Sequence, residues 1–354
     1  MKLAFVSRHL PQEEGTAAGR QLWAVGEALR AAGHDVTAFC WRPEPAAGPY
    51  ADWCEWRPLP PAAAVRVRSR ALLLPRSDVV RAGWSAASDA VAVADDPGSA
   101  PAVTGQGCLD VTTVHFSVAL DRAALHDRAP RVVQDWRGER RAVRRARSVW
   151  VLSDRVGAAV GRGTWVPPTV PVPVAPLPAV DEPVVGLLAD WSWPPNRLAA
   201  DALLRCWPSV RAEVPGARLL LAGRGTSPVG ALAGVEWMGP VRQVSDLLGR
   251  CAVFAFPCPA TSGPKMKVMD ALAHGVAVVT TESGVEGLVD GRSAASVGAE
   301  SSLSERLVAL LRDPAARAAL AGAGRQLLVQ HHSPEQAALA RVRAVQQQLA
   351  GARS

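Results

Sequence analysis

Lysine is almost missing from this sequence, although positive charge is not. The 354-residue chain has 39 Lys and Arg residues and a net charge of +7, yet only Lys2, Lys265 and Lys267 are lysine. Asparagine occurs once, as Asn196. Heavy use of Ala and Arg with so little Lys and Asn is typical of a GC-rich genome, so the net charge alone identifies no partner. A lysine that is kept in such a composition is therefore informative.

Other absences exclude whole classes of protein. No apolar run approaches the ~20 residues that a membrane-spanning helix needs, and the start, MKLAFVS, reads as a first strand rather than a signal peptide. The six cysteines form no C-x-x-C pair, which predicts buried thiols in a reducing cytoplasm and no metal site. The arginines are not interleaved with aromatic residues, so we expect no nucleic acid partner.

The length and the 49% hydrophobic content suit two domains, each with its own core. A proline-rich stretch, WVPPTVPVPVAPLPAVDEP at 165–183, can be neither a helix nor a central strand and is typical of a stiff linker. We therefore predict domains at 1–176 and 177–354, both of α/β class because strand-like runs alternate with helix-like runs. Two such halves would face each other across a cleft, a favoured place for ligands.

The stretch 251–288 predicts a strand, a helix and a second strand. Apolar runs at 251–256 and 276–281 have the composition of buried strands, and the helix between them would run from Pro264 to His274 and end at Gly275. The short crossover demands parallel pairing. Ligands bind outside the carboxyl ends of parallel strands, so the loops 257–263 and 282–287 should meet at a binding edge.

Two of the three lysines, Lys265 and Lys267, fall in the first turn of this helix. Cations there oppose the helix dipole at about 0.3–1 kcal/mol each, and a bound anion would reverse that sign. The pattern predicts a phosphate site, with Asp270 placed to accept hydrogen bonds from ribose hydroxyls. The alternative is a solvated helix start in which Lys267 pairs with Asp270.

The amino half holds a similar unit: a strand at 2–7, a loop at 8–19, a helix at 20–32 and a strand at 35–40. The loop lacks G-x-G-x-x-G, which disfavours a dinucleotide site. Further on, DVTTVH at 110–115 predicts a strand that ends in His115 at its carboxyl edge. That histidine could hydrogen-bond a ligand and help to move a proton, or it could simply bond a loop carbonyl.

Three other segments carry candidate residues. After a strand at 184–189, Asn196 is well placed to N-cap a helix. After a strand at 218–222, Gly223 would let a backbone approach and Arg224 could reach a diphosphate. The arginine-dense segment 128–147 predicts a helix whose cations contact anionic lipid weakly or a phosphorylated acceptor, or else a solvated helix face.

The segment GPKMKVMDALAHGVAVVTTESGVEGL resembles the donor site of retaining nucleotide-sugar glycosyltransferases of the GT-B fold, family 4 (glycosyl transferases group 1). AGHDVTAF and the W-x-P-N arrangement before Arg197 resemble other segments of these enzymes. The resemblance implies that Lys265 and Lys267 clasp the donor diphosphate and that Asp270 binds ribose. Many members have Glu where this chain has Ser262.

The same resemblance assigns further residues. His115 would lie beside the reacting sugar, and Gly15, with Gly19 and Arg20, would face the donor phosphate across the cleft. Backbone in VEWMGPV would meet the base. The resemblance also implies that six further residues bind the donor: Met238, Gly239, Val241, Gly263, Val268 and Gly284.

The implied architecture is two Rossmann-like domains, with a last helix at about 334–349 that crosses back to the first. The implied activity is transfer of a sugar from a nucleoside-diphosphate sugar to an acceptor hydroxyl on a small molecule or glycan, with retention, no cofactor and no metal. Lys267, Arg224 and His115 would carry the catalysis. Two alternatives stay open: a non-catalytic GT-B partner subunit, which Ser262 favours, and a nucleotide-sugar epimerase.

Overall fold

The computed structural model describes residues 1–41, 49–56, 64–67, 70–75, 84–127, 129–227 and 232–351. The chain forms two compact units: Met1–Thr169 with Pro334–Ser354, and Val170–Ser333. The division therefore falls at Thr169 rather than at residue 176. Val170, near the start of the proline-rich stretch, is fully buried in the core of the second unit. The stretch therefore packs on that unit from Val170 onward. No helix in the described ranges has both the length and the apolar character that crossing a bilayer requires.

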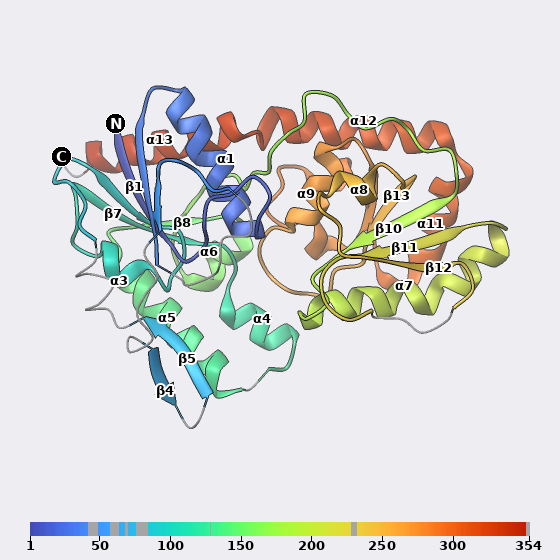
Figure 1. Cartoon of the computed structure of the whole chain (residues 1–354), viewed down its shortest axis with the longest axis horizontal. Helices are drawn as coiled ribbons and strands as arrows, with labels where there is room; N and C mark the ends of the chain where they lie inside the picture. The colour runs from blue at the N-terminus through green and yellow to red at the C-terminus, as the bar shows by residue number, and fades with distance from the viewer. Residues whose placement is uncertain are drawn as a thin grey trace. The chain divides into compact units, whose positions relative to one another are not determined.

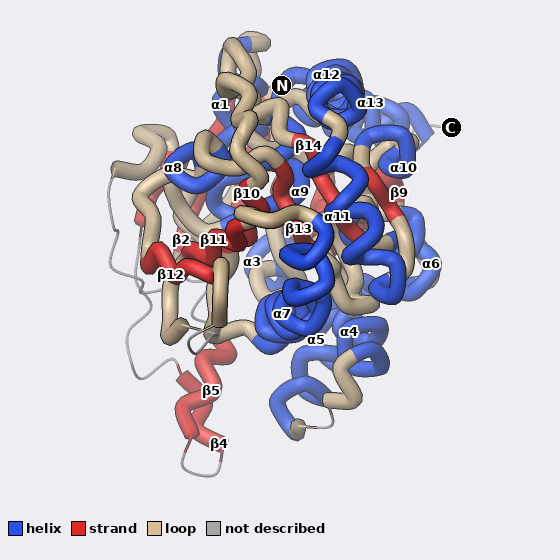
Figure 2. Tube along the Cα trace, turned by 90° about the vertical axis from the view of Figure 1, so that its right-hand side faces the viewer, coloured by secondary structure: helices blue, strands red, loops and turns tan. Residues whose placement is uncertain are grey.

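A seven-stranded sheet forms the centre of the first unit, in the order β3-β2-β1-β6-β7-β8-β9. All neighbouring strands pair in parallel. A separate antiparallel hairpin of β4 and β5 lies apart from this sheet (Figure 2). The strands of the unit are β1 (Lys2–Ser7), β2 (Asp35–Cys40), β3 (Cys54–Trp56), β4 (Ala64–Val67), β5 (Arg70–Pro75), β6 (Val91–Ala94), β7 (Leu109–Val114), β8 (Ser148–Val151) and β9 (Thr164–Trp165).

The helices of the first unit come from both ends of the chain. The last helix packs against the first, and residues such as Ala337 and Val345 belong to the same core as β1 and β7. Buried Arg341 of that helix donates to the Pro167 carbonyl at 3.3 Å, which fixes the start of the linker. These helices are α1 (Ala17–Ala31), α3 (Ala100–Val103), α4 (Val118–Ala124), α5 (Pro130–Arg145), α6 (Asp154–Val160) and α13 (Pro334–Gly351).

Helix α1 begins earlier than the predicted residue 20. Thr16 caps it by accepting a hydrogen bond from the Gly19 amide at 3.2 Å, so Gly19 lies in the helix rather than in the loop. The predicted start of the arginine-dense helix, Arg128, lies outside the described residues, and α5 itself begins at Pro130.

The second unit is built on a six-stranded parallel sheet in the order β12-β11-β10-β13-β14-β15. Counted within the unit, that order is 3-2-1-4-5-6, the doubly wound arrangement. The order reverses between β10 and β13, and this switch point is where such sheets bind ligands. The strands are β10 (Val184–Leu188), β11 (Arg218–Ala222), β12 (Val235–Gly239), β13 (Val253–Phe256), β14 (Ala277–Thr280) and β15 (Ser296–Val297).

Helices cover both faces of the second sheet, and α7 and α12 lie on opposite sides of β10 in Figure 1. The larger helices bury apolar residues such as Leu203, Leu272 and Leu328 in one continuous core. The helices of the unit are α7 (Pro194–Glu213), α8 (Ser245–Leu248), α9 (Met266–Ala273), α10 (Gly291–Ala294), α11 (Leu303–Arg312) and α12 (Pro314–His331), with 3-10 turns at Glu282–Gly284 and Glu300–Ser302.

The predicted strand–helix–strand unit is confirmed as β13, α9 and β14. The two strands pair in parallel, with Val253 opposite Ala277. Gly275 ends the helix at φ +74, as predicted. The predicted start at Pro264 is wrong, because the extended residue Lys265 (φ −101, ψ 93) is the N-cap and the helix begins at Met266.

The proline-rich stretch is held by arginines of α12. The Arg325 guanidinium donates to the carbonyls of Pro173 (2.6 Å) and Val174 (3.1 Å) and also to Ala273. The Arg317 guanidinium donates to the Val180 carbonyl at 3.3 Å. Carbonyls without a strand partner are thus satisfied by side chains, and from Val170 onward the stretch is part of the second unit.

Candidate functional site

The loops that follow β10 and β13 meet at the switch point of the second sheet. Lys267 Nζ donates to Asn196 Oδ1 at 2.5 Å, and Asn196 Nδ2 donates to the Asp190 carbonyl at 2.6 Å. Asn196 was predicted to be an N-cap, and that prediction is wrong: Trp193 is the N-cap of α7. The two prolines after Trp193 start the helix, so Asn196 lies in its first turn, 3% exposed, with its amide bonded to the two loops.

Burial disfavours the charge of Lys267, whereas one aromatic contact favours it. Its ammonium lies over the Phe256 ring, 4.3 Å from the centroid. Burial lowers the pKa of Lys267 to about 7, and the neighbouring Lys265 lowers it further, against the opposing influence of Cys258, Asp190 and Asp270. The hydrogen bond goes to a neutral amide rather than to a carboxylate. Lys267 is therefore a cation site that an anion would stabilise.

Lys265 is held by the loop that precedes α9. Its Nζ is buried and donates to the carbonyls of Thr261 (3.4 Å), Ser262 (3.0 Å) and Gly263. The ammonium therefore closes the loop before α9. Lys267, by contrast, donates to the Asn196 side chain, which comes from a distant segment of the sequence.

The two small-residue loops do meet at one edge, as predicted. The Gly263 amide donates to Glu286 Oε1 at 2.9 Å, and Thr281 Oγ1 donates to the Cys258 carbonyl at 2.7 Å. Glu286 was missed by the sequence analysis, although it stands in the second of these loops. Gly284 has a packing role here, since a Cβ on it would lie 1.8 Å from Thr280 Oγ1.

The loop after β11 reaches the same edge. Gly223 has φ +129, and a Cβ there would lie 1.7 Å from the Ala189 carbonyl, so the close approach it allows is to this chain's own backbone. The Arg224 side chain is exposed. Burial raises the pKa of Asp190, but hydrogen bonds from Ser192 and the charges of Arg224 and Lys267 leave it lower than usual. Arg224 and Lys267 therefore act on one carboxylate.

The remaining donor candidates are placed in three ways. The Asp270 side chain is 3% exposed, and Val268 is fully buried in the core with its amide donating to the Lys265 carbonyl at 2.8 Å. Met238 and Val241 are partly exposed around the end of β12. Between them, Gly239 has φ +76 and open space where a Cβ would stand.

In the first unit, His115 directly follows β7, at the carboxyl edge predicted for it. Its Nε2 donates to the Asp95 carbonyl and lies 3.5 Å from Asp95 Oδ1, while Nδ1 lies 3.5 Å from Gln21 Nε2. Burial lowers the pKa of His115, but the charge and hydrogen bonds of Asp95 outweigh burial and raise it. The imidazole ring therefore bonds a loop carbonyl, which was one of the two roles expected for it. Asp95 also keeps the ring basic.

Asp95 and Asp96 were missed by the sequence analysis. They follow β6, beside the point where the strand order of the first sheet reverses, and Ser7 Oγ at the end of β1 donates to Asp95 Oδ2 at 3.1 Å. Asp96 accepts from the Ser99 hydroxyl at 2.8 Å. The signal was available, because two adjacent carboxylates directly follow the apolar run VAVA.

The predicted amino-terminal loop residues mainly have packing roles. A Cβ on Gly19 would lie 2.2 Å from the Leu10 carbonyl, and Gly15 stands against the Gln12 side chain. Arg20 Nε donates to the Glu13 carbonyl at 3.3 Å.

Comparison with known proteins gives the second unit a family. Residues 182–313 match the family described as glycosyl transferases group 1. This span contains every residue of the switch-point site, from Asp190 to Glu286. No curated protein matches the chain by sequence.

Solved structures share the fold of this protein over most of its length. Sucrose-phosphate synthase from Thermosynechococcus elongatus has 15% identity and a TM-score of 0.72, covering 99% of this chain and 100% of its own. Anabaena HepE in complex with UDP-glucose has 13% identity and a TM-score of 0.68 over 98% and 100%. TarM of S. aureus has 12% identity and a TM-score of 0.62, and the match covers 75% of this chain but 57% of TarM. These likenesses show the GT-B fold.

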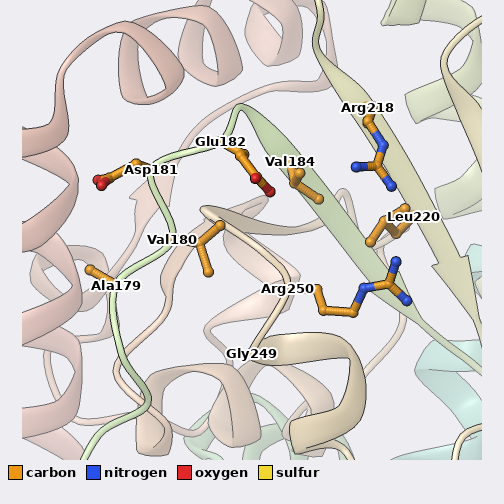
Figure 3. A pocket seen from close by; sticks show the side chains of 9 residues that line it. All are labelled: Ala179, Val180, Asp181, Glu182, Val184, Arg218, Leu220, Gly249 and Arg250. Carbon is orange, nitrogen blue, oxygen red and sulfur yellow. The ribbon is translucent and has the colours of Figure 1, made fainter.

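A cavity of about 440 Å³ in the second unit lies at the other edge of the sheet, beside the amino ends of β10 and β11 (Figure 3). Arg218 and Arg250 line it, and both guanidinium groups approach Glu236, at 2.9 and 3.8 Å. None of the predicted site residues lines this cavity, and its cations already have a carboxylate. The switch point remains the candidate site.

Glu139 of α5 gives the protein a measurable pH dependence of stability. Its carboxylate is buried and accepts from the Val118 amide at 3.0 Å. Burial raises the pKa of Glu139 to about 7, and Asp121 adds to this against the Val118 hydrogen bond. The folded state therefore keeps a proton that the unfolded state loses above its ordinary pKa, so stability declines as pH rises from about 4.5 to 7.

We expect Glu139→Gln to flatten that decline by about 1–3 kcal/mol between pH 5 and pH 8. Thermal unfolding at both pH values measures it, with exposed Glu335→Gln as the matched control. Parallel pH curves for the wild type and Glu139→Gln would contradict the assignment.

Proposed function

We propose that the chain transfers a sugar from a nucleoside-diphosphate sugar to an acceptor hydroxyl. The observation that carries this is the Lys267 ammonium, desolvated and bonded to a neutral amide at the switch point of the group 1 domain. A site of this kind suits an anion brought by a ligand. Anabaena HepE was solved with UDP-glucose and TarM with UDP, which makes uridine nucleotides the first donors to test.

The mechanism follows from the charges. As the glycosidic bond breaks, negative charge builds on the departing nucleoside diphosphate, and Lys267 with Arg224 would stabilise it more in the transition state than in the ground state. We propose that these cations serve without a metal ion, that no cofactor is needed, and that the anomeric configuration is retained. Activity unchanged in EDTA, and a product whose anomeric NMR coupling matches the donor's, are the expected results. Cytoplasmic action likewise stays a prediction.

The decisive experiment is turnover. Purified protein is incubated with UDP-, GDP-, dTDP- and ADP-sugars, with and without candidate small-molecule and glycan acceptors, and release of nucleoside diphosphate is followed. Transfer or slow hydrolysis with at least one donor is expected. Binding without turnover across the panel would favour the non-catalytic alternative, which buried Ser262 supports, because it stands where many group 1 enzymes place a carboxylate.

The arginine face of α5 is the further partner surface that we propose, for weak contact with an anionic membrane. Exposed cations cluster on one side of the helix, whereas Glu139, Ala142, Val143 and Ala146 are buried on the other. Within the described residues, the ion pairs between cations and acidic side chains involve none of these arginines. They are Arg137, Arg140, Arg141, Arg144 and Arg145.

We expect the protein to sediment with phosphatidylglycerol vesicles but not with phosphatidylcholine vesicles, and to be released by salt. The double variant Arg141→Glu and Arg144→Glu should lose most of this binding, while Arg242→Glu and Arg250→Glu in the second unit should not. Equal sedimentation with both lipids, or retention by nucleic acid instead, would contradict the proposal.

A further inference from the structure

Asn196 is the only asparagine in the chain, and it stands between the two loops of the switch point. It donates through Nδ2 to the Asp190 carbonyl at 2.6 Å and accepts through Oδ1 from Lys267 Nζ at 2.5 Å. Only one orientation of the amide satisfies both bonds, because the carbonyl must accept and the ammonium must donate. The side chain is 3% exposed, so this orientation is also fixed by packing.

We propose that Asn196 is a positioning residue for the donor diphosphate: its neutral amide aims the Lys267 ammonium at the switch point without neutralising it. This inference rests on the proposed function. A carboxylate at the same place would form an ion pair with Lys267 and compete with phosphate for it. An apolar side chain would leave the ammonium without its hydrogen bond. An amide is the side chain that holds the cation and still leaves its charge available.

Four other titratable side chains act on Lys267, and the Cys258 thiol among them is neutral because burial raises its pKa. Asp270 lies on the same helix, Lys265 precedes it, Cys258 follows β13, and Asp190 follows β10. Asp190 Oδ1 already accepts from the Ser192 amide at 2.9 Å and from its hydroxyl at 2.6 Å.

A consequence for binding follows. The pKa of Lys267 lies at about 7 in the free protein because burial disfavours the ammonium. A bound diphosphate favours the ammonium and raises that pKa, so binding above pH 7 takes up a proton. Affinity is then highest below pH 7 and falls by up to ~10-fold per pH unit above it. Lys267→Arg, which stays protonated, should remove this dependence.

The scarcity of lysine makes the test direct. Protein labelled with ¹³C-lysine gives three Cε signals, from Lys2, Lys265 and Lys267, which single variants assign. In the wild type we expect the Lys267 signal to titrate near pH 7 and to move to higher pH when UDP, or whichever diphosphate of the panel binds, is added. In Asn196→Asp the signal should titrate above pH 9, and UDP affinity at pH 7 should fall at least 10-fold and lose its pH dependence.

Asn196→Ala is the second variant, because Asn196→Asp also sets a carboxylate oxygen against the Asp190 carbonyl and could disturb folding. It should weaken UDP binding at least 5-fold at pH 7 while the affinity still falls above pH 7. Circular dichroism and the Lys2 signal report the fold of each variant. Wild-type affinity in Asn196→Ala, or a wild-type pH profile in folded Asn196→Asp, would overturn the role of Asn196.

The two levels of the proposal fail in different ways. If no diphosphate of the panel perturbs the Lys267 signal in the wild type, the phosphate site itself is wrong. If a diphosphate does perturb it and the Asn196 variants bind normally, only the positioning role is overturned.

Discussion

Lys267→Met is expected to weaken binding of the donor's nucleoside diphosphate by ~10- to 100-fold. The variant removes a charge-assisted hydrogen bond, which contributes about 1.5–3 kcal/mol, while methionine keeps most of the contact with the Phe256 ring. Isothermal titration calorimetry with UDP, or with the diphosphate that the donor panel identifies, measures the effect at pH 6.5, where the wild-type amine is mostly charged.

Two matched variants isolate this effect. Lys2→Met removes an exposed lysine that pairs with Asp89 in the first unit, and its affinity should equal that of the wild type. Lys265→Met should lower the melting temperature, because its ammonium closes the loop of Thr261 to Gly263. Unchanged affinity in Lys267→Met would remove Lys267 from the donor site.

His115→Ala is expected to reduce sugar transfer by about 100-fold or more while nucleotide affinity stays within ~2-fold. The ring stands at the carboxyl edge of β7, where Asp95 holds it by hydrogen bonds and keeps it basic. Its loss removes a group of the first unit and leaves Lys267 and Asn196 in the second unit intact. Steady-state kinetics with a saturating donor, alongside calorimetry, separates the two effects.

Exposed His331→Ala on α12 is the control for His115→Ala, and it should transfer sugar at the wild-type rate. A wild-type rate in His115→Ala would leave that histidine with only the structural role that its bond to the Asp95 carbonyl already gives it.

The local sequence pattern predicted the strands, the helices and the binding edge of the second unit. It could do so because apolar runs determine strands, and glycines determine helix ends and loops, within a few residues of themselves. It did not predict what Asn196 and Lys265 do. Asn196 looked like an N-cap by its neighbours, but its partner Lys267 is 71 positions away in the chain. Lys265 looked like a phosphate ligand by its spacing, but loop carbonyls next to it in sequence accept its ammonium.

The domain division shows a similar limit. The prolines correctly indicated a segment outside helix and sheet, but not which unit would hold it. The carbonyls of Pro173, Val174 and Val180 have their partners in Arg325 and Arg317, more than 130 positions away, so the stretch joins the second unit. Asp95 and Asp96 were visible as residues, yet only the strand order placed them beside Ser7 and His115.

Helix α13 completes the core of the first unit with residues from the end of the chain. During synthesis, the whole second unit leaves the ribosome before that helix does. The first unit must therefore wait, with the face of α1 that α13 later covers still open to solvent and chaperones, until α13 has emerged as well. A released chain that ends at residue 333 should contain a folded second unit beside a first unit that proteases still cut.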